Sequence, residues 1–402
     1  MRAINIKKMH EVNISLLLNT IRVNSPISRS EISRLIHLSP SAVSNIVDLF
    51  IKTGFVSEVT NDGANVIRRN RKLILNEERY FPIGIEIEND RILGIVINLV
   101  GDVLKQELTY FSPNTDYKEI LNKVIEIFYT LVKDFSSDQI MGVGIAIPGS
   151  IDTKQGISIF SPNLGWRNVH VKEFIKDKIN FPIFIEHNVK AVTLGELWYG
   201  AGVGRDNLIC VRVGSGVSAG FVIDGNIYQG LNGLAGEFGH TVVEKDGKRC
   251  RCGSYGCLET YVSTQVLIDR VLEGIREGAY TQISLENKTR EQMLEEIFLV
   301  GKKGDKFILN IFEKMGEYLG IGISNLINIF NPGLVVIAGG LARAGDLLLD
   351  PVKKTVQLHA FSPIPEITTS KLGSLTCAIG AATLVIKDAF SHPQKRMEAL
   401  TV

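Results

Sequence analysis

The first 75 residues have apolar positions spaced as on the buried faces of α-helices. Ile14, Leu17, Leu18 and Ile21 recur at intervals of three and four residues, and the polar segment 24–26, which contains a proline, ends that pattern. This spacing predicts a first helix with one buried face.

Two further helices are predicted by their start signals. Ser28 is followed three residues later by Glu31, the arrangement of a capping box, and Ser39 precedes Pro40 as a cap precedes the first helical residue. The third helix has apolar positions at 43, 46, 47 and 50, and it ends at Gly54. Strand-like segments at 55–59 and 72–75 follow. Three helices and a β-hairpin are typical of a winged helix-turn-helix.

After residues 76–80 the pattern changes to alternating strands and helices. A run of three predicted strands opens this part of the chain and recurs more than a hundred residues later, which indicates a weak internal duplication and a two-lobed α/β body. The predicted strands are 83–88, 92–99, 103–111, 141–147, 208–213, 217–223, 226–229 and 334–338, and the predicted helices are 118–133, 308–329 and 378–389.

Charge is distributed unevenly along the chain. The whole protein has a formal net charge of +1, but residues 1–80 contain twelve Lys and Arg against seven Asp and Glu, a net charge of +5. A basic N-terminal module on a mildly acidic body favours a small anion-binding domain. No apolar run is long enough to span a bilayer, no signal peptide is recognisable, and five cysteines are too few for a disulfide scaffold. We therefore expect a cytoplasmic protein without a membrane partner.

A cluster of metal-ligand residue types follows residue 239. His240 precedes Cys250, Cys252 and Cys257, and one imidazole with three thiolates suits a structural zinc ion with no position left for a catalytic water. A reduced thiol cluster is the alternative. Glu237, His240 and Glu259 are also suited to hydrogen-bonding a polyhydroxylated ligand, although solvated loop charges are the ordinary explanation of such residues.

Several long motifs resemble those of the ROK family (repressors, open reading frames and sugar kinases). They are Gly236–His240, Cys250–Glu259, Pro148-Gly149, Ser161–Trp166, Gly195–Gly202 and Asn331–Leu341. The resemblance extends over most of residues 82–390. It implies an actin-like ATPase fold of two ribonuclease-H-like lobes, with a sugar bound in the cleft, and in the repressor branch a winged helix-turn-helix precedes this domain.

The resemblance gives the expected domain boundaries. The winged helix-turn-helix occupies residues 1–75 and a linker occupies 76–82. The first lobe comprises 83–195 plus 376–390, and the second lobe, with the zinc site, comprises 196–375.

Two features that a family kinase needs are changed in this chain. The first phosphate-binding turn, rich in glycine in the kinases, here contains Glu88 and Asp90, which add negative charge where phosphate would lie. The position of the catalytic Asp is occupied by Asn188, whose amide cannot accept a proton from a sugar hydroxyl. A second glycine-rich turn, 214–216, is retained. The resemblance therefore implies sugar binding without phosphorylation.

The expected sugar contacts follow from the family pattern, and the expected DNA contacts follow from the geometry of a winged helix-turn-helix. The expected sugar contacts are Asn163, His187, Asn188, Glu237, His240 and Glu259, where His187 departs from the Asn that is usual in the family. The expected DNA contacts are Ser41, Ser44 and Asn45 at the start of the recognition helix, Ser28 and Arg29 toward phosphate, and Arg68, Arg69 and Arg71 on the wing. His240, Cys250, Cys252 and Cys257 are the expected zinc ligands.

These observations predict a sugar-responsive transcription factor, most simply a repressor of carbohydrate-utilisation genes, which binds operator DNA as a homodimer or a dimer of dimers. Two alternatives stay open: an ATP-dependent sugar kinase of the same family, and a regulator controlled by a protein partner instead of a free sugar. The sequence identifies neither the sugar nor the operator, and it does not distinguish repression from activation.

Overall fold

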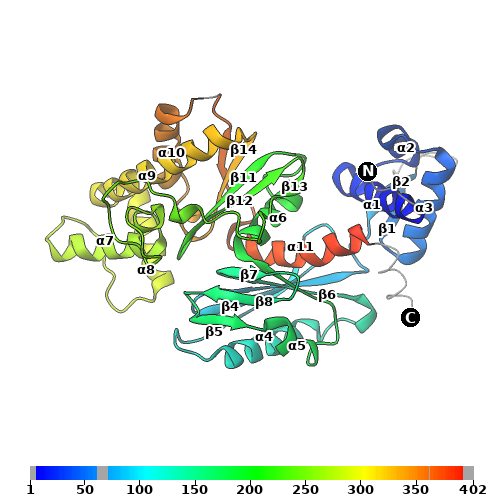
Figure 1. Cartoon of the computed structure of the whole chain (residues 1–402), viewed down its shortest axis with the longest axis horizontal. Helices are drawn as coiled ribbons and strands as arrows, with labels where there is room; N and C mark the ends of the chain where they lie inside the picture. The colour runs from blue at the N-terminus through cyan, green and yellow to red at the C-terminus, as the bar shows by residue number, and fades with distance from the viewer. Residues whose placement is uncertain (1–5, 61–70, 362, 393–402) are drawn as a thin grey trace. The chain divides into compact units, whose positions relative to one another are not determined.

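A computed structural model of the chain describes residues 6–60, 71–361 and 363–392 (Figure 1). The chain divides into two compact units: Met1–His187 with Ala378–Val402, and Asn188–Cys377. The lobe boundaries expected from the family pattern stay a prediction.

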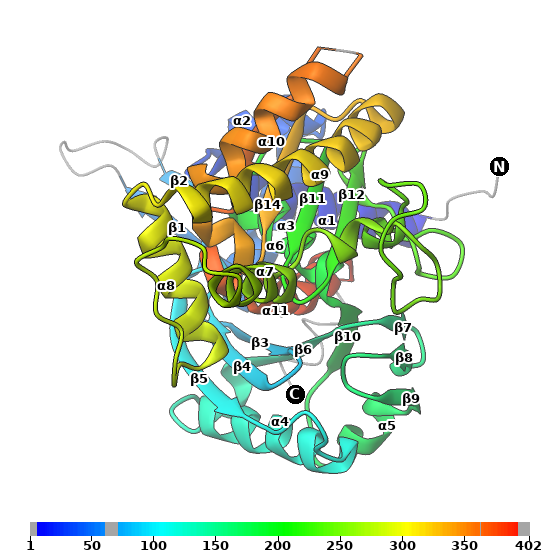
Figure 2. The same ribbon diagram turned by 90° about the vertical axis from the view of Figure 1, so that its left-hand side faces the viewer.

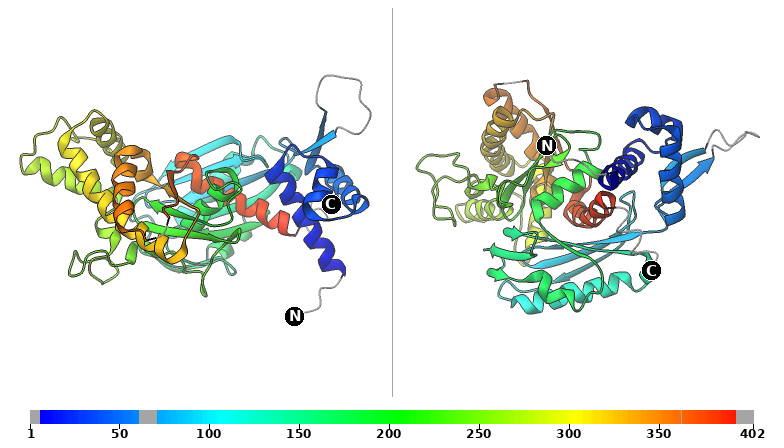
Figure 3. Two further views of the ribbon diagram at one scale, coloured as in Figure 1. Left: turned by 90° about the horizontal axis from the view of Figure 1, so that it is seen from above. Right: turned by 45° about the vertical axis from the view of Figure 1, so that its right-hand side comes forward.

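The N-terminal part of the first unit has the predicted winged helix-turn-helix elements (Figure 3). They are α1 (Ile6–Asn24), α2 (Arg29–Ile36), α3 (Pro40–Thr53), β1 (Val56–Thr60) and β2 (Arg71–Leu75). Ser28 and Glu31 form the predicted capping box, and Ser39 caps α3 with Pro40 as its first residue. β1 and β2 pair in antiparallel register. The local start and stop signals were therefore sufficient to place these elements.

A five-stranded mixed sheet forms the centre of the rest of the first unit. Its strand order is β10-β6-β3-β4-β5. The strands are β3 (Phe81–Ile87), β4 (Arg91–Ile97), β5 (Val103–Tyr110), β6 (Ile140–Ile147) and β10 (Ile183–His187). Helices α4 (Tyr117–Val132) and α5 (Val171–Lys176) cover one face (Figure 2). A smaller sheet of β7 (Ser150–Asp152), β8 (Ile157–Ser161) and β9 (Trp166–Val169) adjoins it.

The C-terminal helix α11 (Thr376–Ser391) packs directly on the backbone of this sheet. A Cβ atom at Gly144 would lie 1.8 Å from the carbonyl oxygen of Ala381, so only glycine permits the approach. The segment Gly373–Ser391 has the length and hydropathy of a membrane span, but 67% of its most apolar window is buried inside the protein. A buried core helix has the same composition, and the close packing on the sheet explains it here.

The second unit repeats the arrangement of the first. Its sheet has the order β13-β12-β11-β14-β15, formed by β11 (Leu208–Val213), β12 (Val217–Ile223), β13 (Asn226–Ile227), β14 (Leu334–Ala338) and β15 (Glu366–Thr369). In both sheets the first three strands are antiparallel, and the two later strands run parallel to the first. The internal duplication predicted from the sequence is confirmed by this shared topology.

Helices complete the second unit. α6 (Asn188–Tyr199) packs against β11 and β12. The main apolar core of this unit lies among the sheet, α7 (Thr264–Arg276), α8 (Arg290–Lys302), α9 (Lys306–Phe330) and α10 (Asp346–His359) (Figure 1). The segment between β12 and α7 contains little regular structure, and it holds the predicted metal ligands.

Candidate functional site

The four predicted metal ligands lie together in the second unit. One donor atom from each of His240, Cys250, Cys252 and Cys257 lies within 4.8 Å of the other three. Nδ1 of His240 is 3.6 Å from Sγ of Cys250, and Sγ of Cys252 is 3.7 Å from Sγ of Cys257. Zn–S bonds of about 2.3 Å in a tetrahedron place sulfur atoms about 3.8 Å apart. The donor set and its spacing therefore fit a four-coordinate zinc ion.

The backbone around these ligands depends on a tight turn. Gly256, which precedes Cys257, has a φ of +71°, and a Cβ atom there would lie 1.8 Å from the carbonyl oxygen of Glu244. Cys257 and Cys250 are buried, whereas Cys252 is exposed. Burial and the neighbouring thiols raise the pKa of Cys257 to about 12 in the absence of metal. A bound Zn²⁺ would deprotonate such a thiol outright.

His240 connects the metal ligands to the predicted sugar contacts. Its Nδ1 faces the cysteines, and its Nε2 lies 4.0 Å from Oε2 of Glu237. Burial raises the pKa of Glu237, while His240 opposes that rise. If a metal occupies Nδ1, the proton on Nε2 points toward the Glu237 carboxylate, so the ion fixes both the tautomer and the ring orientation.

Glu259 belongs to the same group of residues and has partners on both oxygens. Oε2 accepts a hydrogen bond from the backbone N–H of Val217 at 3.1 Å, and Oε1 forms an ion pair with Arg251 at 3.0 Å. Glu259 is also close enough to Glu237 to raise its pKa. The carboxylates of Glu237 and Glu259 thus lie close to His240, one of the four predicted metal ligands, which is an arrangement suited to binding vicinal hydroxyl groups.

The remaining predicted sugar contacts divide between the units. Asn163 and His187 belong to the first unit, with His187 as the last residue of β10. Asn188 begins α6 in the second unit and is 2% exposed. Their role in sugar binding stays a prediction.

The turn at which the family pattern places the first phosphate of a kinase joins β3 to β4. β3 ends at Ile87 and β4 begins at Arg91, and the intervening turn is closed by an ion pair of 2.5 Å between Glu88 and Arg91. The second turn, Gly214–Gly216, connects β11 to β12, and the backbone N–H of Gly214 bonds to the carbonyl oxygen of Gly216. A carboxylate in the first turn would repel a nucleotide phosphate.

Lys190 was missed by the sequence analysis. It is 2% exposed, its Nζ donates to the carbonyl oxygen of Gly233 at 2.5 Å, and its charge lowers the pKa of Glu237. Lysine is rarely buried without a partner. The sequence did contain one indication that Lys190 is buried: it is a single charged residue among the small apolar residues Val189, Ala191 and Val192.

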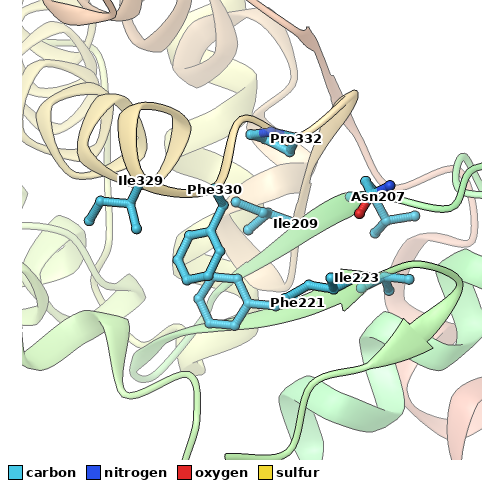
Figure 4. Close-up of a pocket in the computed structure, with 9 residues that line it drawn as sticks. Asn207, Ile209, Phe221, Ile223, Ile329, Phe330 and Pro332 are labelled. Carbon is cyan, nitrogen blue, oxygen red and sulfur yellow. The ribbon is translucent and has the colours of Figure 1, made fainter.

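A separate pocket of about 160 Å³ lies at β11, β12 and the end of α9 (Figure 4). The rings of Phe221 and Phe330, which both line the pocket, stack on each other with centroids 4.5 Å apart. The side chains that line it are apolar apart from that of Asn207.

The predicted DNA contacts on α3 lie on its solvent-facing side. Ser41 and Asn45 are exposed and Ser44 is half-buried, whereas the intervening Val43, Ile46 and Val47 are buried. An exposed first turn of a recognition helix is free to enter the major groove. Ser28 is less available, because its hydroxyl donates to Glu31 at 2.7 Å within the capping box.

Two of the predicted phosphate-contacting arginines are held by carboxylates in the free protein. Arg29 forms ion pairs with Asp48 at 2.8 Å and with Glu58 at 2.9 Å, and Arg71 forms one with Glu58 at 2.7 Å. These pairs, which the sequence analysis did not foresee, place both guanidinium groups at the junction of α3 and the hairpin. Arg68 and Arg69 lie outside the described residues.

Comparison with known proteins gives the same two-part division. The ROK family model matches residues 82–388, and a model described as winged helix-turn-helix DNA-binding matches residues 14–57. The xylose repressor of Caldicellulosiruptor bescii is 32% identical over 392 residues, which cover 96% of this chain and 98% of that protein. The xylose repressor of Bacillus subtilis is 32% identical over 94% of this chain and 95% of its own. The DNA-binding transcriptional dual regulator NagC of Escherichia coli is 27% identical, and the match covers 95% of this chain and 94% of NagC.

Solved structures include both branches of the family. A ROK family transcriptional regulator, described as a homologue of the E. coli MLC protein, has a TM-score of 0.81 and 25% identity, covering 97% of this chain and 99% of its own. A ROK glucokinase from Streptomyces griseus, in complex with glucose and AMPPNP, has a TM-score of 0.69 and 27% identity over 76% of this chain and 98% of its own. Because the likeness to the regulators includes the N-terminal domain, this chain belongs to the transcriptional-regulator branch of the ROK family.

Proposed function

We propose that this protein is a sugar-responsive repressor that binds operator DNA through α3 and the β1–β2 hairpin. One observation carries the proposal: the helices and paired strands of a winged helix-turn-helix precede a ROK domain in which Asn188 stands, by the family pattern, at the position of the catalytic Asp. An amide can hold a sugar hydroxyl by a hydrogen bond but cannot accept its proton. The relatives that match over nearly the whole chain are named as repressors or transcriptional regulators.

The proposed sugar contacts are Asn163, His187, Asn188, Glu237, His240 and Glu259. The protein binds the sugar through them and does not phosphorylate it. The turn at Glu88 supports this absence of kinase activity, because it lacks the glycines that let backbone N–H groups approach phosphate in the kinases, and Asp90 adds a negative charge beside the neutral Glu88–Arg91 pair. Two relatives about a third identical to this chain are named xylose repressors, so D-xylose is the first effector to test.

Zinc is proposed as a structural ion on His240, Cys250, Cys252 and Cys257. It would supply loop stability and no chemistry, because four protein ligands leave no open position. The ion would fix His240 beside Glu237 and so preorganise the sugar contacts. A repressor of this kind acts on operator DNA in the cytoplasm, as a homodimer or a dimer of dimers.

The alternative of a sugar kinase with an attached DNA-binding domain is supported by the retained Gly214–Gly216 turn and by the structural likeness to glucokinases. A coupled assay with ATP and a panel of pentoses, hexoses and amino sugars distinguishes the two functions. We expect no turnover above background with any sugar, and turnover at ordinary kinase rates would overturn the proposal.

Operator release tests the regulatory function directly. Binding sites are selected from random DNA duplexes, and fluorescence anisotropy then measures the affinity of the full chain with and without each sugar. We expect one sugar to weaken DNA binding, and by linkage the same DNA to weaken binding of that sugar by an equal factor. Operator release by no sugar would instead favour control by a protein partner.

A further inference from the structure

Lys190 lies in the first turn of α6, two residues after Asn188, and is only 2% exposed. Its apolar neighbours Val189, Ala191 and Val192 are buried as well, so the ammonium group stands inside the second unit. Lysine is almost never fully buried unless it is paired, because removing its charge from water costs free energy. The groups around the ammonium must therefore balance its charge.

The ammonium group holds the loop that runs from β13 to Glu237. Nζ of Lys190 donates a hydrogen bond of 2.5 Å to the carbonyl oxygen of Gly233 in this loop. Gly233 and Gly236 have φ angles of +72° and +111°, which glycine adopts without strain. The carbonyl oxygen of Gly236 accepts a hydrogen bond of 2.9 Å from the backbone N–H of Ala219 in β12. The loop is thus fixed at two points directly before Glu237.

The same loop brings Glu237 close to the first turn of α6. A Cβ atom at Gly236 would lie 3.8 Å from Cγ1 of Val189, so the backbone just before Glu237 lies against the residue just before Lys190. Burial raises the pKa of Glu237, and the charges of His240 and Lys190 oppose that rise. Lys190 is therefore a counter-charge of Glu237 as well as an anchor of its loop.

The second carboxylate of the proposed site has a cation of its own. Oε1 of Glu259 forms an ion pair of 3.0 Å with Arg251, whose side chain is 64% exposed. Glu237 and Glu259 are thus each compensated by a cation of the protein. Both can still accept hydrogen bonds from hydroxyl groups, whereas a positively charged ligand would also meet the repulsion of Lys190 and Arg251.

We propose that Lys190 is a positioning residue of the sugar site: it anchors the loop before Glu237 and compensates the charge of that carboxylate, so that the site favours a neutral sugar over a protonated amino sugar. The inference rests on the proposed function for its ligand. The tie between Lys190 and Glu237, however, can be tested without any ligand.

A double-mutant cycle tests this tie. Thermal unfolding is measured for Lys190→Met, for Glu237→Gln and for the double variant. The loss of Tm in the double variant is expected to be smaller than the sum of the two single losses, because each single substitution leaves the other charge uncompensated. In a control cycle, the exposed Glu277→Gln replaces Glu237→Gln and should be additive with Lys190→Met.

The cycle stays decisive where the single variant is unstable. If Lys190→Met alone does not fold, rescue of its folding by the added Glu237→Gln supports the tie. Additive losses of Tm in the Lys190–Glu237 cycle, or no rescue, would overturn the proposal.

Sugar selectivity supplies the second measurement. Titration calorimetry at pH 7, where an amino sugar is largely protonated, compares D-xylose with 2-amino-2-deoxy-D-xylose and D-glucose with D-glucosamine. In Lys190→Met the ratio of affinities within a pair should shift about tenfold toward the amino sugar, because the charge of Glu237 is no longer compensated. Lys302→Met, which removes an exposed lysine of the same unit, should leave the ratio unchanged.

The ratio separates the proposed role from a merely structural one. A loop that is only loosened weakens binding of both sugars alike, so an unchanged ratio in Lys190→Met, or in the polar Lys190→Gln if the first variant does not fold, would overturn the selectivity. Failure of the unaltered chain to bind any of the four sugars contradicts the proposed sugar site and the selectivity with it, whereas the result of the double-mutant cycle stands.

Discussion

The backbone N–H of Val217 donates a 3.1 Å hydrogen bond to Oε2 of Glu259. Val217 begins β12 directly after the retained glycine-rich turn, and Glu259 lies two residues beyond the last predicted zinc ligand. The same carboxylate is paired through Oε1 with Arg251, which stands between two of the cysteines. One side chain thus connects the glycine-rich turn, the segment of the predicted metal ligands and the proposed sugar contacts.

Replacing Glu259 with Gln is expected to abolish the thermal stabilisation of the protein by its sugar effector. The substitution removes a charged acceptor, and a hydrogen bond to a charged group contributes about 1.5–3 kcal/mol, so sugar affinity should fall roughly 10- to 100-fold. Titration calorimetry with the best sugar measures the loss. Glu277→Gln, on the surface of the same unit, serves as a control, and equal affinity in the two variants would exclude Glu259 as a sugar contact.

Zinc content and stability should fall together when Cys257 is replaced with Ser. The unaltered protein is expected to contain about one zinc ion per chain, and the variant to contain little. Its Tm should fall on the order of 5 °C or more, because a structural metal is lost from the loop. Cys377→Ser changes a buried cysteine outside the cluster, and this control should retain the metal. Full zinc occupancy in Cys257→Ser would contradict the ligand assignment.

Features that depend on short stretches of sequence could be predicted. The capping box of Ser28 and Glu31 and the Ser39-Pro40 start are local interactions, so their residues alone placed α2 and α3 within one or two positions. The metal cluster was similarly visible, because three of its ligands lie within eight residues and form a donor set with few other uses.

Features that depend on residues far apart in the chain could not be predicted. Glu58 lies 29 residues from Arg29 and 13 from Arg71, and only the folded hairpin brings the three side chains together. Helices α7, α8 and α10 were missed. The sequence of α8 is only weakly amphipathic. In α10, Pro351 interrupts the apolar pattern, although the proline lies inside the helix and packs against Gly316 of α9. α7 and α8 do carry local start signals, the cap Ser263 and the capping box of Thr289 and Gln292, so only for α10 does tertiary packing override the local signal.

The buried Glu196 should make the stability of the second unit depend on pH. Its Oε1 accepts from the hydroxyl of Ser370 at 2.5 Å and its Oε2 accepts from the backbone N–H of Ala201 at 2.9 Å, yet burial raises its pKa. A raised pKa means that the contribution of Glu196 is fully present below its unfolded value of 4.5 and is lost as pH rises through the folded pKa. The Tm advantage of the unaltered protein over Glu196→Gln should therefore shrink as pH rises from 4.5 toward 7.5.

A matched surface substitution controls for this pH effect. Glu366→Gln changes a side chain that is 57% exposed and paired with Arg205, so its Tm difference from the unaltered protein should vary much less over the same pH range. A Tm difference for Glu196→Gln that stays constant from pH 4.5 to 7.5 would contradict the assigned direction.

The contact between the winged module and the C-terminal helix should be sensitive to Phe390. Its ring lies 6.4 Å from that of Phe55, which in turn lies 4.6 Å from the ring of Tyr80, and all three side chains are at most 2% exposed. Truncating a buried Phe to Ala costs about 3–5 kcal/mol. In calorimetry of Phe390→Ala, the winged module should therefore unfold in a separate step at lower temperature than the rest of the chain. Tyr129→Ala, which changes a half-exposed aromatic residue elsewhere in the first unit, should show no such step.

Glu58 should restrain DNA binding. The carboxylate holds Arg29 and Arg71 in the free protein, and the Arg71 hydrogen bond is the main reason that the pKa of Glu58 is lowered. A lowered pKa means that these pairs stabilise the fold above pH 4.5 and that this contribution is lost as pH falls through the folded value. At pH 7, Glu58→Gln should therefore destabilise the winged module slightly, yet strengthen DNA binding by releasing Arg71 toward phosphate, whereas Arg29 keeps its ion pair with Asp48.

The salt dependence of DNA affinity separates this effect from a general change in charge. Each additional phosphate contact steepens the slope of log K against log salt by about 0.9. Glu58→Gln should steepen that slope by about one such contact, that of Arg71, whereas Glu77→Gln changes an exposed carboxylate after the hairpin and removes the same charge without releasing an arginine. Arg71→Ala should make the slope shallower. Equal slopes for the two Gln variants would show that Arg71 does not reach phosphate, because releasing it would then add no ionic contact.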